Sequence, residues 1–331
     1  MTDADRLRLY ERLWEGPMYQ RWHWLAYNFA PHETGETPFA RLVFDAILRC
    51  DAAMPGYAEE MLGRLELMGG ADRDMDDYER IRQWLGELVV VHHLVAWPWP
   101  CLVAFEDEPV VPGSPKNPEI AVRGDGFVLG AEVKTPDLRP LADGGRQSAP
   151  WQLLARGRVP PSAYPGGATL PRDNPVKDFL ASANAKFAAF RQADPAFVCV
   201  LFIVWDDYVN EPISALLNPA SGLLTPNSFD RDENGEPRAY QSVDAVVVLR
   251  HQVQLQEGMA NRPPLDERWH FLDYGAADRF PFNALVVNPH GRPLPEPVAD
   301  ALQAVPADRL LSEYMPSDFV MWIGTDPGTD Q

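Results

Sequence analysis

Residues 117–134 of this chain read NPEIAVRGDGFVLGAEVK. Apolar runs on both sides of Gly-Asp-Gly are typical of a β-hairpin with a tight turn. A loop of Gly124 and Asp125 would make Glu119 a diagonal cross-strand neighbour of Glu132, roughly 7 Å away. A loop of Asp125 and Gly126 would place Glu119 directly opposite Glu132. In both registers the two carboxylates project from the same face of the hairpin.

Alternation of side chains along a strand puts Gly130, Glu132 and Lys134 on that same face. The opposite face is apolar and is expected to pack into a core; it carries Phe127, Leu129, Ala131 and Val133. Gly126 and Gly130 lack side chains, so we expect the face with the carboxylates to stay open to a phosphate.

An acid on one strand followed by acid-x-lysine on the next resembles the PD-(D/E)XK phosphodiesterases, the restriction-endonuclease-like nucleases. Pro118-Glu119 matches the first part of that pattern, and Glu132-Val133-Lys134 matches the second. The separation, 132 − 119 = 13 residues, lies within the range the family uses. The first acid is glutamate where aspartate is commoner, which keeps the charge but lengthens the reach. The resemblance spans residues 78–250.

The resemblance implies a nuclease that binds Mg²⁺ or Mn²⁺, with Glu119, Glu132 and the Val133 backbone carbonyl as metal ligands. It also implies that Lys134 orients the attacking water and stabilises developing negative charge. Oxygen ligands of this kind suit Mg²⁺. Glu87 is a further candidate ligand, because family members often add an acid from the preceding helix. It is the only Asp, Glu, Lys or Arg in the apolar half of that helix. The alternative for Glu87 is a place on the helix surface.

A helix is expected after the hairpin, with Asn174 as its N-cap and Pro175 in the first helical position. Lys177, Asn184 and Lys186 lie off its apolar stripe and are candidates for binding a nucleic-acid phosphate. Each can equally be an ordinary solvated residue of the helix.

The predicted fold class is α/β, with a restriction-endonuclease-like core of a central mixed sheet flanked by helices. The run 197–205 is apolar throughout, as in a strand buried on both faces. The expected division is a helical N-terminal region at 1–72, the α/β core at 73–290 and a peripheral C-terminal segment at 291–331.

A long loop is expected at 138–173, within the α/β core. It is rich in Pro and Gly and holds several arginines: Arg139, Arg146, Arg156, Arg158 and Arg172. A loop of this length is usually functional or disordered. It is interpreted either as a lid or clamp over the site or as a surface insertion.

The net charge is 29 − 48 = −19, which opposes nonspecific binding to nucleic acid or to an anionic membrane. Residues 116–191 hold eleven basic and seven acidic side chains, a local sum of +4 that falls on the candidate site. The three cysteines form neither a metal-binding spacing nor a disulfide framework. With no signal-like or membrane-spanning run, a cytoplasmic location is expected.

The sequence leaves two other functions open. The chain can be a catalytically inactive binding or interaction protein on the same fold, and the acidic body favours that alternative. Paired glutamates also serve glycosidases, but that interpretation leaves Lys134 without a role. A homo-oligomer or a protein partner is compatible with the sequence, and whether the nucleic acid is DNA or RNA is left open.

Overall fold

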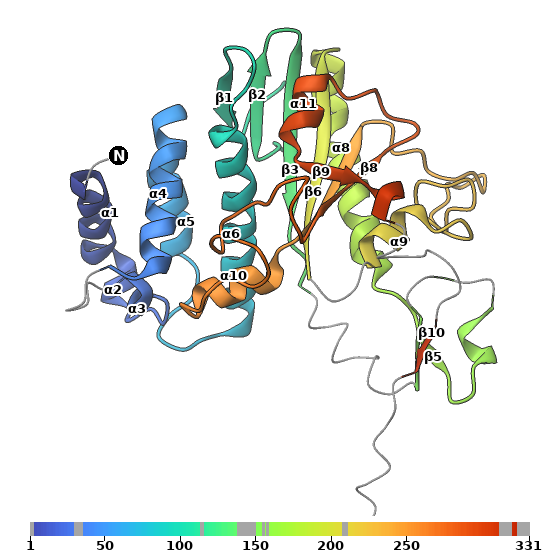
Figure 1. Ribbon diagram of the computed structural model, residues 1–331, viewed down its shortest axis with the longest axis horizontal. Helices are drawn as coiled ribbons and strands as arrows, with labels where there is room; N and C mark the ends of the chain where they lie inside the picture. The colour runs from blue at the N-terminus through green and yellow to red at the C-terminus, as the bar shows by residue number, and fades with distance from the viewer. Residues whose placement is uncertain are drawn as a thin grey trace, which may run out of the picture.

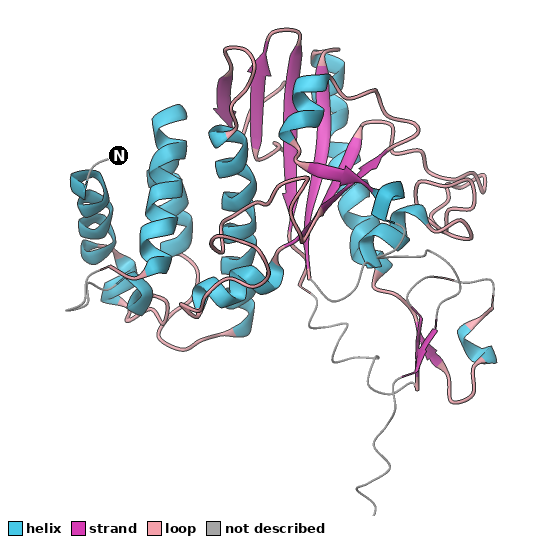
Figure 2. Ribbon diagram, in the orientation of Figure 1, coloured by secondary structure: helices cyan, strands magenta, loops and turns pink. Residues whose placement is uncertain are grey.

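The computed structural model describes residues 3–29, 36–112, 116–137, 150–153, 156, 159–206, 211–310 and 320–322. A mixed sheet of seven strands is flanked by helices on both faces, which confirms the α/β class (Figures 1 and 2). In sheet order, the strands are β1 (Ala104–Asp107), β2 (Ile120–Gly124), β3 (Phe127–Lys134), β6 (Phe197–Trp205), β7 (Ala245–Arg250), β8 (Asn283–Val287) and β9 (Ala304–Pro306). No helix within the described residues has the length and apolar character needed to cross a bilayer.

The predicted hairpin is formed by β2 and β3, and its loop is Asp125-Gly126. Gly124 pairs with Phe127, and the antiparallel register continues to Ile120 opposite Ala131. Gly126 has φ 79°, in the left-handed region that glycine adopts without strain. Of the two turns expected from the sequence, the structure therefore has Asp125-Gly126. The regular pairing ends at Ile120, and the Glu119 N–H bonds to the carbonyl of Ala131, so the ladder does not include a Glu119–Glu132 pair.

Helix α8 (Asp173–Ala193) connects β3 to β6, which pair in parallel. All nine residues of β6 are buried, as expected for a central strand. The predicted N-cap at Asn174 is wrong: α8 starts at Asp173, and Arg172 is the N-cap residue. The Asp173 carboxylate accepts hydrogen bonds from Arg156 and lies at the positive end of the helix dipole, which favours the earlier start.

Helix α6 (Met75–Ala96) precedes the sheet, and Asp74 caps it by accepting hydrogen bonds from the backbone N–H groups of Asp76 and Asp77. Helices before α6 form the predicted helical N-terminal region and lie beside α6, away from the sheet (Figure 1). They are α1 (Asp3–Glu15), α2 (Pro17–Gln20), α3 (Ala26–Phe29), α4 (Pro38–Ala53) and α5 (Tyr57–Glu66).

The sheet extends past the predicted end of the core at residue 290. β9 pairs in parallel with β8, so the segment from 291 is only partly peripheral. Shorter helices pack into the cores on the two faces of the sheet: α9 (Glu211–Leu217), α10 (Gln252–Met259), α11 (Glu296–Ala301) and the 3₁₀ helix Ala307–Leu310.

Part of the expected loop at 138–173 is structured. β4 (Trp151–Leu153) pairs with β5 (Ala168–Thr169) and with β10 (Val320–Trp322) in a small separate sheet, and a 3₁₀ helix spans Pro161–Ala163. Arg139, Arg146 and Arg158 lie outside the described residues.

Two apolar cores fill the space on either side of the sheet. The core on one face joins α4 and α6 to Phe127, Leu129, Ala131 and Val133, which confirms the predicted core face of β3. The core on the other face joins α8 to β6, with Phe187 and Phe197 packed together. Both faces of β3 are therefore covered by helices, and the candidate site lies at the strand's end.

Gly130→Ala is expected to lower the free energy of unfolding by about 1–3 kcal/mol, as overpacked cores do. A Cβ atom at residue 130 would lie 2.2 Å from Cε1 of Phe197, inside the core between the sheet and α8. Gly63→Ala, in α5 with nothing within 4 Å, is the matched control and should stabilise by roughly 0.5–1 kcal/mol. Urea denaturation of both variants measures the two changes in the free energy of unfolding. A Gly130→Ala variant as stable as wild type would contradict the prediction.

Candidate functional site

A cavity of about 520 Å³ lies between α6 and α8, at the carboxyl end of β3. Glu119, Val133, Lys134 and Thr135 line it from the hairpin, and Arg64 and Glu87 line it from α5 and α6. Helix α8 contributes Asp178, Phe179 and Ser182. The structure thus brings Glu87, Glu119 and Lys134 together on one cavity, with Glu132 directly beneath Lys134.

The cavity exists because β2 is shorter than β3 at this end. Pairing between the two strands stops at Ala131, whose carbonyl accepts a hydrogen bond from the Glu119 N–H at 2.9 Å. Backbone groups alternate in direction along a strand, so the Val133 carbonyl faces the same side as that of Ala131. On that side no β2 residue pairs with Val133. The carbonyl predicted as a third ligand therefore faces the edge where the sheet is open.

Glu132 lies between two ammonium groups and has no exposed surface. Nζ of Lys134 is 2.7 Å from Oε1 of Glu132, and Nζ of Lys186, on α8, donates to Oε2 at 2.5 Å. Although Lys134 is close to Oε1, the angle is not that of a hydrogen bond, and this buried oxygen accepts none. Lys134 is the more exposed of the two lysines and is the one that lines the cavity.

Burial and the charges at the cavity shift the pKa values of Glu119 and Lys134. Burial, together with the charges of Glu87 and Glu132, raises the pKa of Glu119 to about 8, against the opposing effect of Lys186 and Lys134. Burial alone would lower the pKa of Lys134, but the charges of Glu132, Glu119 and Glu87 outweigh it and raise that pKa. The ammonium of Lys134 is therefore held in its charged form.

Glu87 is buried and is bound in a bidentate ion pair by Arg64. Nη1 of Arg64 is 2.7 Å from Oε1 of Glu87, and Nη2 is 2.6 Å from Oε2. The alternative that Glu87 sits on the helix surface is therefore wrong. Both of its oxygens are engaged by a protein cation, and both oxygens of Glu132 likewise lie beside a lysine. Glu119 is the acid of the motif that lines the cavity directly.

The donors at this cavity suit a small hard cation, because they are carboxylate, carbonyl and hydroxyl oxygens. Two buried oxygen atoms beside the cavity have no hydrogen-bond partner among the described residues: Oε1 of Glu132 and Oγ1 of Thr135. Buried polar atoms of this kind usually have a partner. Among the described residues, no group of three or more His, Cys, Asp or Glu is arranged to hold a metal ion, so a site here would rest on two carboxylates and backbone oxygen.

The expectation that Gly130 leaves its face open is wrong. The rings of Phe197 and Phe187 lie against Gly130 and cover that part of the strand. The cavity at the end of the strand reaches Glu119 directly, whereas Glu132 has no exposed surface. Lys186, predicted to contact phosphate, is buried against Glu132 and has no direct route to a ligand on the surface in this conformation.

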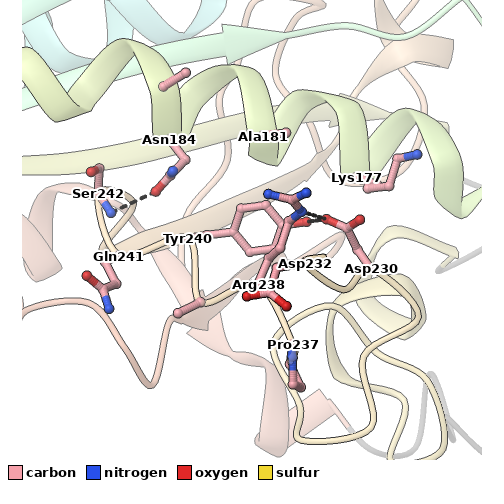
Figure 3. A pocket seen from close by; sticks show the side chains of 12 residues that line it. Lys177, Ala181, Asn184, Asp230, Asp232, Pro237, Arg238, Tyr240, Gln241 and Ser242 are labelled. Carbon is pink, nitrogen blue, oxygen red and sulfur yellow. Dashed lines mark hydrogen bonds and ion pairs between the residues drawn. The ribbon is translucent and has the colours of Figure 1, made fainter. Parts of the chain in front are cut away.

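Lys177 and Asn184 line a second cavity, of about 800 Å³, between α8 and the segment 230–242 (Figure 3). Asn184 accepts a hydrogen bond from the Ser242 N–H at 2.8 Å, which leaves its amide N–H groups for other partners. Arg238 enters the same cavity and lies 3.4 Å from Asp230. Lys177, half-buried, lies 3.4 Å from the exposed Asp178. Pairs this exposed are weak, so both cations can exchange partners with a ligand.

The sequence did not predict two contacts at this site: the ion pair of Lys186 with Glu132 and the ion pair of Arg64 with Glu87. The pairs are 54 and 23 residues apart along the chain. One signal was present for Lys186, because it directly precedes the core residue Phe187 on a helix covering the sheet. A cation beside the apolar stripe of such a helix has to reach a carboxylate or solvent.

Comparison with protein-family models, with curated proteins and with solved structures finds no match to this chain.

Proposed function

We propose that this chain is a divalent-metal-dependent nuclease that hydrolyses phosphodiester bonds in nucleic acid. The observation that carries the proposal is that Glu119 and Lys134 line one cavity at the end of β3, with Glu132 buried 2.7 Å from Nζ of Lys134. The order of elements, with a buried helix before the strands and a helix and buried strand after them, supports a restriction-endonuclease-like core.

Glu119, Glu132 and the Val133 carbonyl would hold the cation. A bound Mg²⁺ would activate water and neutralise charge on the phosphate. Lys134 holds a positive charge at the cavity, where it can orient a water molecule and stabilise negative charge as it develops on the phosphate. Burial and the contacts with Lys134 and Lys186 hold the Glu132 carboxylate in place in the free protein.

The test is incubation of the protein with single- and double-stranded DNA and RNA, with Mg²⁺ or Mn²⁺ and with excess chelator. We expect at least one substrate to be cut in the presence of metal and none in the chelator. Lys134→Ala is the control for a contaminating nuclease, because it should be inactive on the same substrate. If wild type binds nucleic acid but wild type and Lys134→Ala are equally inert, the chain is the catalytically inactive binding protein instead.

The second cavity gives the proposed path of the substrate. At 3.6 residues per turn, Lys177, Ala181 and Asn184 occupy one arc of α8, and Asp178 and Ser182 occupy the next. The two cavities are therefore neighbours across one helix, and the exposed residues between them include alanines whose small side chains do not block passage. We propose that a nucleic-acid strand crosses α8 here and that Lys177 and Arg238 bind its phosphates.

Lys177→Ala combined with Arg238→Ala is expected to weaken nucleic-acid binding about tenfold near 0.1 M salt. Loss of two phosphate contacts should also flatten the slope of log affinity against log salt by roughly 1.4 for a single strand. Arg49→Ala combined with Arg262→Ala is the matched control, because it removes two exposed cations outside both cavities. Fluorescence anisotropy over a salt series measures the affinity and its salt dependence for each double variant. Equal slopes for the two double variants would rule out this path.

A further inference from the structure

The Lys186 ammonium has no place in the acid-x-lysine motif, yet it makes one of the shortest contacts at the site. It donates to Oε2 of Glu132 at 2.5 Å, from a side chain that is 10% exposed. Helix α8 carries it over the face of β3 from which Glu132 projects. Because Lys186 reaches the cavity only through Glu132, any effect it has on a ligand passes through that carboxylate.

The charges around the cavity are balanced only when Lys186 is counted. Glu87, Glu119 and Glu132 supply three negative charges, and the cations opposite them are Arg64, Lys134 and Lys186. The other charged residues of the lining, Arg80 and Asp178, each have a surface partner, Asp77 and Lys177. The cavity therefore has no net negative charge to offer a cation.

A divalent ion entering alone would bring two positive charges into a buried space that already holds three. Like charges within a few ångströms repel strongly where water is excluded. A nucleic-acid phosphate entering alone would be repelled by the negative charges of the carboxylates. Entering together, the ion and the phosphate largely cancel each other's charge, so each should improve the binding of the other, and such coupling is reciprocal.

We propose that Lys186 is a positioning residue that occupies Glu132 in the absence of substrate and thereby couples metal binding to phosphate binding. The proposal rests on the proposed function, because it concerns the same cavity. Lys186 holds Oε2 of Glu132 while Lys134 lies 2.7 Å from Oε1, so a cation has to displace an ammonium to reach either oxygen. Lys186 thereby makes metal binding to the free protein weak, so that the complete site forms only when nucleic acid is present.

The experiment is calorimetric titration of Mn²⁺ into wild type, Lys186→Gln and Lys186→Arg, each with and without a phosphorothioate oligonucleotide that resists cleavage. Wild type should bind Mn²⁺ at least about tenfold more tightly when the oligonucleotide is present, within the usual range of coupling. Lys186→Gln keeps a hydrogen-bond donor but loses the charge, so it should bind Mn²⁺ about tenfold more tightly than wild type without nucleic acid. Lys186→Arg should restore wild-type behaviour.

The sign of the Lys186→Gln effect separates this role from a merely structural one, because damage to the fold would weaken metal binding. Equal or weaker binding of Mn²⁺ by a folded Lys186→Gln variant overturns the proposal. If that variant does not fold, the wild-type titrations decide alone, since metal affinity that ignores the oligonucleotide overturns the proposal as well. Wild type that cleaves but shows no coupling leaves the proposed function intact, whereas wild type that neither binds Mn²⁺ nor cleaves removes both.

Discussion

Lys134→Met is expected to lower the rate of nucleic-acid cleavage by about 100- to 1,000-fold at saturating metal and substrate. That is the usual loss when one preorganised donor to a developing negative charge is removed. Lys134 is the ammonium that faces the cavity, and its charge is stabilised there by Glu132, Glu119 and Glu87. Methionine keeps most of the aliphatic stem, so the loss should fall on catalysis rather than on folding.

The matched control for this variant is Arg123→Met, on the same hairpin. Arg123 pairs with Glu106 on the surface, at 3.2 Å, and does not line the cavity. Initial rates of both variants, with circular dichroism to verify the fold, separate a local catalytic loss from a general one. Retention of wild-type rates by Lys134→Met would remove Lys134 from the mechanism.

The local part of this site follows from sequence, because a hairpin fixes its own geometry. Once the turn is Asp125-Gly126, strand alternation places Glu132 and Lys134 on one face of β3, but regular pairing stops at Ile120 and so does not fix the position of Glu119. The sequence left the choice of turn open, since glycine stands on both sides of Asp125. The structure resolves it with a positive φ at Gly126.

Contacts between elements could not be predicted in the same way. The prediction of an open face at Gly130 failed because Phe187 and Phe197 come from α8 and β6, and strand alternation says nothing about what covers a face. The sequence offers Lys186 only as a phosphate-binding or solvated residue for the same reason. Whether a lysine on a helix meets water or a buried carboxylate depends on the rotation of that helix over the sheet, which the apolar stripe fixes only to within a residue or so.

The burial of Glu87 leads to the second large effect, on stability. Arg64→Met is expected to lower the free energy of unfolding by about 3 kcal/mol at neutral pH, at the low end for removing one partner of a buried pair, because Arg64 is itself partly exposed. Glu87 would remain buried with no cation on either oxygen. Arg80→Met is the matched control on the surface of α6, where the pair with Asp77 is exposed, and it should change stability by no more than about 0.5 kcal/mol.

The pH dependence of the Arg64→Met deficit distinguishes charge from packing. Burial raises the pKa of Glu87 even in the wild type, where Arg64 opposes the shift. Without Arg64 that pKa rises further, so the folded variant takes up a proton that the unfolded chain does not hold at neutral pH. A group with a raised pKa stabilises the fold fully below its unfolded pKa, and the benefit is lost as the pH rises through the folded value. The deficit relative to wild type should therefore be largest near pH 7 and shrink toward pH 4.5, as urea denaturation at several pH values can measure.

Arg64→Met combined with Glu87→Met should recover most of the loss, because an apolar pair of similar volume leaves no buried charge. A deficit that is constant with pH and persists in the double variant would show that the Arg64 stem acts by packing, and that the bidentate pair contributes little.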